Sequence, residues 1–164
     1  MSKHLFIIRH AKTEEIQMEQ DDFDRGLLPR GHSDANLIAK TLIELHHLPD
    51  KIYSSPAMRT TQTARIFCEV MKINFQEIVF EDSIYEASLQ ALLNLIVNFD
   101  ESAEKVFLIG HNPSLCMLAD YLTEEEIYSL PTSGTVYIRF EIEKWGEISK
   151  GLGHLEWLKT PKML

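Results

Sequence analysis

The sequence contains four basic side chains whose types could bind and attack an anionic group. Each of them lies just beyond a short apolar run: Arg9, His10, Arg59 and His111. An arginine carries a permanent charge and a planar fork of N–H donors that matches the oxygens of a phosphate or carboxylate. A neutral histidine can act as a nucleophile or as a base. These residue types therefore predict an anion site, provided that the fold brings them together.

The first pair, Arg9 and His10, directly follows the apolar run of residues 5–8. Continuous β-prone apolar residues are typical of a parallel strand that is covered on both faces. Ligands of open α/β sheets bind just beyond the carboxyl ends of such strands. This position predicts an anion site with a nucleophile or base built into it. The alternative is an arginine at a sheet edge beside a solvated histidine.

Arg59 belongs to a second strand-to-helix unit. Residues 51–54 are predicted to form a short strand, followed by Ser55 as the N-cap and Pro56 at the first helical position, where its missing N–H costs nothing. Arg59 then falls in the first helical turn, near the positive end of the helix dipole. A cation is unfavourable there unless an anion is shared. The placement therefore favours an anion-binding role for Arg59 over that of a solvated surface side chain.

His111 follows a third buried-strand run at residues 106–109. Gly110 permits a sharp turn, Asn112 can cap a helix and Pro113 can open it. A polar side chain is again delivered to the carboxyl end of a strand, at the start of a helix. Three such turns together favour a shared site over three unrelated surface features.

Strand and helix patterns alternate along the rest of the chain. A helix with an apolar stripe is predicted at 35–42, a strand at 77–80, a helix at 89–96 and an alternating, half-buried strand at 135–142. Such alternation predicts an α/β protein with a largely parallel central sheet and helices on both faces. The apolar stripes are interpreted as core.

Length and composition fit one domain over residues 1–164. The chain is 45% hydrophobic, which is enough to bury a sizeable core without dividing in two. Its formal net charge of −9 argues against nucleic acid as a partner. The acidic segments 14–15, 19–24 and 124–126 are interpreted as solubilising surface. We expect no membrane segment, because no run is long and apolar enough to cross a bilayer.

Three segments of the sequence resemble the motifs of the histidine phosphatase (phosphoglycerate mutase-like) superfamily. They are RHAKT from Arg9, SSPAMRTTQTA from Ser54 and GHNP from Gly110. The RHAK form and the small size are similar to the SixA-type phosphohistidine phosphatases, as is Asp24-Arg25-Gly26-Leu27 followed by Gly31 and Asp34-Ala35. The resemblance covers residues 5–134 and continues weakly to 161. It implies a three-layer α/β/α sandwich of the phosphoglycerate mutase-like type.

The resemblance also implies a catalytic mechanism. His10 attacks phosphorus and forms a phosphohistidine that water later hydrolyses, while Arg9, Arg59 and His111 hold the phosphoryl oxygens. The positive charge that phosphoryl transfer requires comes from these side chains, so neither a metal ion nor another cofactor is expected. The chain also lacks the clustered Asp and His ligands of a two-metal phosphatase.

The two cysteines do not indicate a metal site. Cys68 and Cys116 fall within predicted helices and have no metal-ligand spacing. Two buried, unpaired thiols are typical of a cytoplasmic protein, which is the location we expect.

Three hypotheses stay open for the substrate. The chain has little room for the insertions that cover the pocket in relatives acting on small sugar phosphates, and an open site suits a phosphorylated protein side chain. We therefore expect hydrolysis of phosphohistidine on a protein such as a phosphorelay domain. The alternatives are a phosphomonoesterase or mutase of the same superfamily that acts on a small phosphate ester, and a catalytically silent module that binds phosphorylated ligands. Retention of His10 together with both arginines and His111 argues against the silent module.

Glu86 is a candidate general acid. It lies where mutase-like relatives carry their acid–base glutamate, but the glycines that usually follow are absent and residues 87–89 run on toward a helix. The alternative role is that of a carboxylate at a helix N-terminus. The distinction matters for an alcohol leaving group, which needs a proton donor. An imidazole leaving group needs far less help, since the pKa of its conjugate acid is roughly 6.5.

Overall fold

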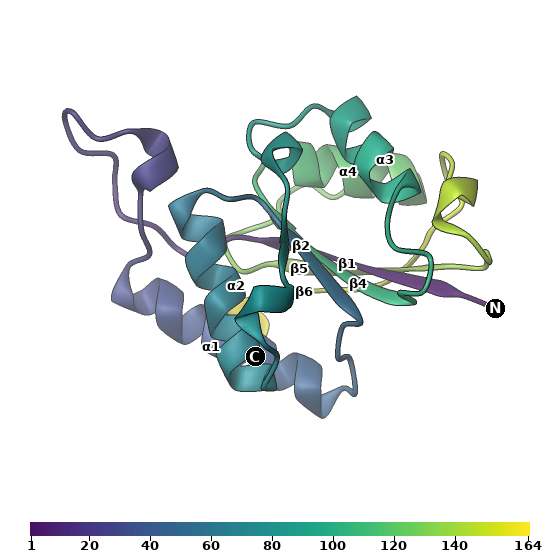
Figure 1. Cartoon of the computed structure of the whole chain (residues 1–164), viewed down its shortest axis with the longest axis horizontal. Helices are drawn as coiled ribbons and strands as arrows, with labels where there is room; N and C mark the ends of the chain where they lie inside the picture. Colours follow the sequence, from purple (N-terminus) through teal and green to yellow (C-terminus); the bar gives the residue numbers. More distant parts are fainter.

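Six strands form one mixed sheet in the order β3-β2-β4-β1-β5-β6 in the computed structural model, which describes all residues from Met1 to Leu164 (Figure 1). The strands are β1 Lys3–Arg9, β2 Lys51–Ser54, β3 Val79–Phe80, β4 Lys105–Gly110, β5 Thr135–Phe140 and β6 His154–Lys159. The helices are α1 Pro29–Glu44, α2 Met58–Met71, α3 Leu89–Val97 and α4 Ser114–Thr123. Short 3-10 turns lie at η1 Asp22–Asp24, η2 Phe75–Glu77, η3 Asp82–Ile84, η4 Trp145–Glu147 and η5 Pro161–Met163.

Four neighbouring strands of the sheet are parallel and two are antiparallel. β3, β2, β4 and β1 run in one direction, whereas β5 lies antiparallel to β1 and β6 lies antiparallel to β5. The carboxyl ends of β1, β2 and β4 therefore meet at the same edge of the sheet. The prediction of an α/β fold with a largely parallel sheet is confirmed.

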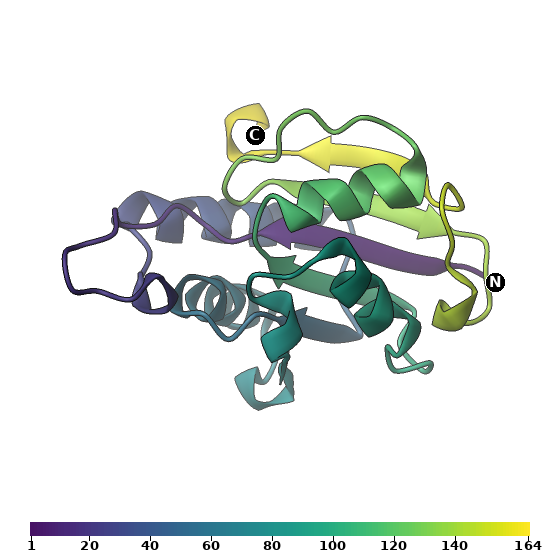
Figure 2. The ribbon, with the colours of Figure 1, turned by 90° about the horizontal axis from the view of Figure 1, so that it is seen from above.

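Alternate residues of β1 pack into two separate hydrophobic cores. Leu5 and Ile7 face the core under α3 and α4, while Phe6 and Ile8 face the core under α1 and α2. All four side chains are fully buried, and each such burial contributes roughly 1.5–3 kcal/mol to folding. Figures 1 and 2 show the two helix pairs on opposite faces of the sheet. This arrangement confirms the three-layer α/β/α sandwich.

The antiparallel half of the sheet departs most from the prediction. The strand predicted at 135–142 ends at Phe140, and it is not half-buried, because Thr135 and Tyr137 are buried as well as the apolar residues that alternate with them. β6, which pairs along the outer edge of β5, was not predicted. The chain then reaches the fully buried Trp145, whose indole N–H donates to the carbonyl of Ala103 at 2.9 Å.

Two further features concern the predictions about membrane segments and about the cysteines. No helix is both long and apolar enough to span a bilayer. Cys68 is buried and Cys116 is half-buried, and both are free thiols. Burial raises the pKa of the Cys68 thiol to about 11, so this side chain is protonated near neutral pH.

Candidate active site

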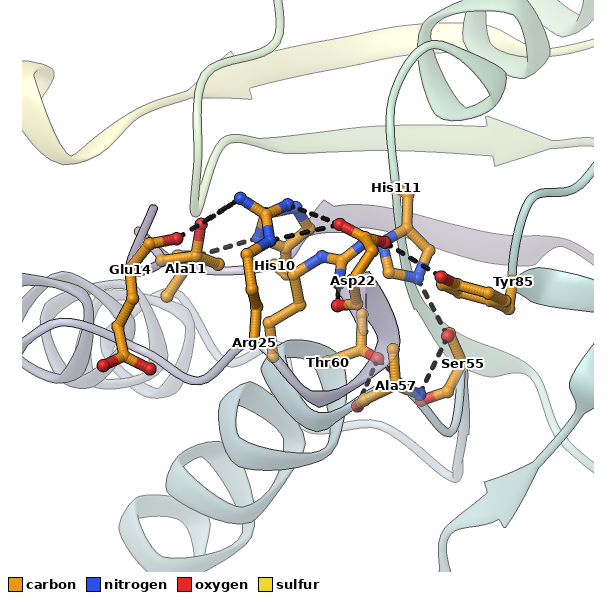
Figure 3. Close-up of polar contacts among 12 residues, drawn as sticks. His10, Ala11, Glu14, Asp22, Arg25, Ser55, Ala57, Thr60, Tyr85 and His111 are labelled. Carbon is orange, nitrogen blue, oxygen red and sulfur yellow. Dashed lines mark hydrogen bonds and ion pairs between the residues drawn. The ribbon is translucent and has the colours of Figure 1, made fainter. Parts of the chain in front are cut away.

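The carboxyl edge of the sheet brings the predicted basic side chains together. His10 follows β1, Arg59 lies in the first turn of α2 after β2, and His111 follows β4 (Figure 3). The rings of His10 and His111 are 5.4 Å apart between centroids. His10, Arg59 and His111 are only 6%, 5% and 7% exposed, respectively. The permanent charges of Arg9 and Arg59 make this site locally cationic on a chain whose net charge is negative.

The ring of His10 is oriented by its own backbone. Nδ1 lies 2.8 Å from the carbonyl oxygen of Ala11. A carbonyl can only accept, so Nδ1 carries the proton and Nε2 keeps a free lone pair. Burial lowers the pKa of His10 to about 4; the charges of Arg9 and Arg59 add to this effect, and the bond to Ala11 opposes it. His10 is therefore neutral near pH 7 and presents Nε2 as a nucleophile.

The ring of His111 is oriented by Ser55, through Nε2 rather than through Nδ1. The hydroxyl of Ser55 accepts a hydrogen bond from the N–H of Ala57 at 3.2 Å and lies 2.8 Å from Nε2 of His111. Burial lowers the pKa of His111 to about 3, with the charge of Arg59 adding, so the ring is neutral. We assign the single ring proton to Nδ1, because the Ser55 hydroxyl already accepts from Ala57 and is free to donate to Nε2. His111 Nδ1 is buried and has no partner.

Arg9 is fixed by the segment that precedes β5. Its Nη1 donates to the carbonyl of Leu130 at 3.1 Å, and Nδ2 of Asn112 donates to the same carbonyl at 2.8 Å. The N–H of Ser133 donates to the carbonyl of His10 at 3.0 Å, which ties the segment to the backbone of His10. Nε of Arg9 is buried without a partner.

Arg59 shares an anion, as its place at a helix N-terminus requires. Its Nη2 donates to Oδ2 of Asp22 at 2.9 Å, and its Nη1 donates to the backbone carbonyl of the same residue at 2.8 Å. Both terminal nitrogens of the fork are thus engaged by η1. Nε of Arg59 is buried and has no partner.

Asp22 is the centre of this network, and the sequence interpretation missed it. Its carboxylate accepts from Arg59, from Nε of Arg25 at 3.1 Å and from the hydroxyl of Tyr85 at 2.9 Å (Figure 3). Burial works against the ionised form, but the bonds from Tyr85 and Arg59 and the two arginine charges hold the pKa of Asp22 below its usual value. The interpretation of the segment 19–24 as solubilising surface is therefore wrong at this residue.

Three buried donors belong to the residues that gather with His10 at the carboxyl edge of the sheet. They are Nε of Arg9, Nε of Arg59 and Nδ1 of His111, none of which has a hydrogen-bond partner. Buried polar atoms are nearly always paired in folded proteins, and each unpaired one costs about 1–3 kcal/mol. Donors left open on residues that gather with a nucleophilic histidine indicate a place for an oxyanion. The geometry thus unites all four basic residues singled out in the sequence.

The local capping predictions are wrong in detail. Helix α2 begins at Met58 and its N-cap is Ala57, so Ser55 is not the cap and Pro56 is not helical. Helix α4 begins at Ser114 with Pro113 as N-cap. The Ser55 hydroxyl still accepts from the N–H of Ala57 just before the helix and also contacts His111, whereas Asn112 donates to the carbonyl of Leu130.

Gly110 allows close packing beside the site. A Cβ at this position would lie 3.0 Å from Cγ2 of Ile84, which comes from η3 beside the site. The glycine thus lets the segment that carries Tyr85 approach the end of β4.

Two polar residues of α2 support the site without having been predicted. The hydroxyl of Thr63 accepts from the N–H of Ala11 at 3.0 Å and donates to the carbonyl of Arg59 at 2.7 Å. Oε1 of Gln62 accepts from the N–H of Leu27 at 2.8 Å. These contacts tie the His10 segment and the Asp22 segment to α2. They also account for the polar residues within the RTTQT stretch.

Glu86 lies at the rim of the site, and its role stays a prediction. It is exposed, has a left-handed backbone with φ of 51°, and precedes the true cap of α3, Ser88. It is therefore not a carboxylate of the first helical turn. Its neighbour Tyr85 packs edge-on against His111 at 5.5 Å between centroids. Burial raises the pKa of Tyr85 to about 12, and the carboxylates of Asp22 and Glu86 add to the rise.

No group of three or more His, Cys, Asp or Glu side chains is placed to hold a metal ion.

The sequence model of the histidine phosphatase superfamily (branch 1) matches residues 5–105. That range includes three of the four basic residues, and His111 lies just beyond it.

Two curated relatives match parts of the chain. An uncharacterised protein of the cyanobacterium Picosynechococcus is 29% identical over 112 residues, which make up 68% of this chain and 67% of that protein. An uncharacterised chloroplastic protein of Arabidopsis thaliana is 37% identical over 65 residues, or 40% of this chain. That match spans only 30% of the plant protein's length.

Solved structures match over nearly the whole chain. A SixA protein from Agrobacterium tumefaciens superimposes with a TM-score of 0.83 at 28% identity, covering 97% of this chain and 98% of that one. The protein histidine phosphatase SixA complexed with tungstate gives a TM-score of 0.84 at 19% identity and covers 98% of both chains. The second likeness, at this identity, is one of fold.

Proposed function

The chain belongs to the histidine phosphatase superfamily, branch 1, and we propose that it hydrolyses phosphohistidine on a protein through a phosphorylated His10. The observation that carries this proposal is the set of three unpaired buried donors on the residues that gather with a neutral His10. A phosphoryl group has three non-bridging oxygens, and its transfer is catalysed mainly by positioning and by charge stabilisation. Substrates with a phosphate ester or phosphoramidate are consistent with the superfamily.

The proposed reaction has two steps. First, Nε2 of His10 attacks phosphorus, the bond from phosphorus to the substrate nitrogen breaks, and the departing imidazole takes a proton from solvent. Arg9, Arg59 and His111 hold the three oxygens during the transfer. Second, water attacks phosphorus, the bond to Nε2 breaks, and inorganic phosphate leaves, while the proton lost by the water passes to solvent. The first step releases the substrate histidine as a neutral ring, and the second restores the neutral ring of His10, which keeps its proton on Nδ1.

A protein substrate fits the site better than a small ester for two reasons. Glu86, the candidate acid for alcohol leaving groups, has an exposed side chain. The imidazole of phosphohistidine can depart without such an acid. The likeness to a SixA protein at 28% identity also supports this substrate class. A phosphorelay domain and a cytoplasmic location belong to the same proposal.

A substrate comparison tests the proposal. We expect kcat/KM for a phosphohistidine peptide to exceed that for a panel of sugar phosphates, with an aryl phosphate as a generic reference. The His154→Ala variant, which replaces an exposed histidine outside the site, should retain the activity, whereas His10→Ala should lose it. Faster turnover of a sugar phosphate would favour the phosphomonoesterase alternative. Binding of oxyanions without any turnover would favour the silent module.

A further inference from the structure

A polar cavity lies beside the segment that follows His10, and Lys12 of this segment lines it. It has a volume of about 430 Å³ and no hydrophobic lining residue. Its charged lining residues are Lys12, Arg30, Asp34 and Lys162, and the hydroxyl residues Thr132 and Thr160 complete the polar wall. Three cations against one carboxylate leave an excess of two positive charges here. The chain as a whole carries −9, so this cavity stands out as a local cationic patch.

The cations of the cavity have few partners within the protein. Arg30 reaches Asp34 only at 3.7 Å, between Nε and Oδ2, and its side chain is 61% exposed. Lys12 and Lys162 are exposed and take part in none of the ion pairs of the chain. Converging like charges repel each other, and a bound anion removes that repulsion. The cavity is thus suited to an acidic group.

The cavity shares its walls with the backbone that positions His10. The carbonyl of Lys12 accepts from the N–H of Leu28 at 2.9 Å, and a Cβ on Gly31 would lie 2.3 Å from the same oxygen. Only a glycine lets α1 press so closely on this segment, which fixes the backbone of Lys12. On the other wall, Thr132 precedes Ser133, whose N–H donates to the carbonyl of His10.

Both the cavity and the catalytic site lie at the carboxyl edge of β1. In Figure 2 the C-terminal turn η5, which carries Lys162, lies at the same end of the sheet as the arrowhead of β1. Lys12 follows His10 by two residues, which span at most ~7 Å. An acidic residue one or two helical turns from a phosphohistidine lies roughly 5–11 Å along the helix axis. These lengths allow one helix of a substrate protein to reach both places.

We propose that this cavity binds a carboxylate side chain of the phosphoprotein substrate, close in sequence to its phosphohistidine. The inference rests on the proposed function and adds to it a preference for acidic residues near the phosphorylated histidine. Lysine and arginine attract the carboxylate and hydroxyl groups donate to it. A plain aryl phosphate has no second anion and does not use the cavity.

A pair of helical phosphohistidine peptides tests the inference. One peptide carries glutamates one and two turns after the phosphohistidine, and the other carries glutamines there. The wild-type protein should show a KM about fivefold lower for the glutamate peptide at low salt, with kcat unchanged. The Lys162→Glu variant should abolish or reverse that preference while leaving aryl phosphate turnover unchanged. The matched control is Lys40→Glu, an exposed residue of α1 that lies ten positions beyond Arg30, or ~15 Å along the helix.

The outcomes separate this inference from the proposed function. Equal turnover of both peptides by the wild-type protein would overturn the carboxylate site and leave the phosphohistidine activity intact. If Lys162→Glu and Lys40→Glu lost the preference for the glutamate peptide to the same extent, this would also overturn the inference, because the effect would then come from net charge. Hydrolysis of aryl phosphate without hydrolysis of either peptide would overturn the proposed function and this inference with it.

Discussion

Asp22 competes with a bound phosphoryl group for Arg59, and the substitution Asp22→Asn tests this competition. Asparagine keeps a side-chain oxygen that can accept from Nη2 of Arg59, and the bond from Nη1 to the backbone carbonyl of residue 22 is unaffected. Arg59 itself is held by burial, with a side chain that is only 7% exposed. The substitution therefore removes one negative charge beside the site while leaving the arginine in place.

The size of the effect follows from the position of the carboxylate. A unit charge roughly 7 Å from a phosphoryl group, at an effective dielectric constant of about 40, opposes each unit of its charge by ~1 kcal/mol. The high dielectric constant is appropriate because the Asp22 side chain is 40% exposed. These oxyanions carry one to two negative charges, so vanadate and phosphate should inhibit the variant about five- to thirtyfold more strongly than the wild-type protein at low salt, and the gain should shrink at high salt.

The assay is competitive inhibition of aryl phosphate hydrolysis, measured at low and at high ionic strength. The control is Asp24→Asn, which removes the same charge from an exposed residue of the same turn that forms no ion pair. Inhibition of the control should stay close to that of the wild-type protein. If Asp22→Asn binds vanadate as weakly as the wild-type protein or more weakly, then Asp22 positions Arg59 and does not compete with the substrate.

Three further predictions concern the basic residues and Glu86. Arg59→Lys should lose most activity and bind vanadate more weakly, because a point charge replaces directed donors, including the unpaired Nε; unchanged inhibition would remove Arg59 from the site. Glu86→Gln should slow alkyl phosphate hydrolysis by ~10²–10⁴-fold and phosphohistidine hydrolysis far less if Glu86 is a general acid; equal small effects would leave it a surface carboxylate. NMR titration should give a pKa of about 4 for His10 and of about 3 for His111. The folded state then binds fewer protons than the unfolded state, so these two residues should make the protein lose stability as pH falls from about 6.5 toward 4. An NMR titration midpoint near 6.5 for either ring would contradict the effect of burial on its pKa.

The strand-to-helix turns could be predicted from the sequence because each is a local feature. An apolar run followed by an arginine or histidine places that side chain at the end of a strand, whatever the rest of the fold does. His10, Arg59 and His111 each follow such a run, and parallel pairing of β1, β2 and β4 then brings them together. The resemblance to a known superfamily added the order in which they act.

The roles of Asp22, Tyr85 and Ser55 could not be predicted in this way, because they depend on contacts between distant parts of the chain. Asp22 and Arg59 are separated by 37 residues, Asp22 and Tyr85 by 63, and Ser55 and His111 by 56. An acidic segment followed by a turn has the composition of solvated surface. The one signal that pointed to Asp22 was the cation at the start of α2, which required an anion nearby.

The antiparallel edge of the sheet was not predicted for a different reason. β6 has half-buried and exposed residues but no continuous apolar run, and its pairing with β5 is interrupted between Tyr137 and Ile138. A strand of this kind is stabilised by its neighbour more than by its own pattern.

Trapping the phosphorylated enzyme tests the central claim most directly. Wild-type protein is mixed with substrate labelled in the phosphoryl group, quenched within the first turnovers, and digested so that the labelled peptide can be identified. A phosphohistidine is stable in base and labile in acid, and we expect such a label on the peptide that contains His10 and none in His10→Ala, which should be inactive but folded. A label on another residue, or a His10→Ala protein with near-wild-type activity, would contradict the covalent mechanism.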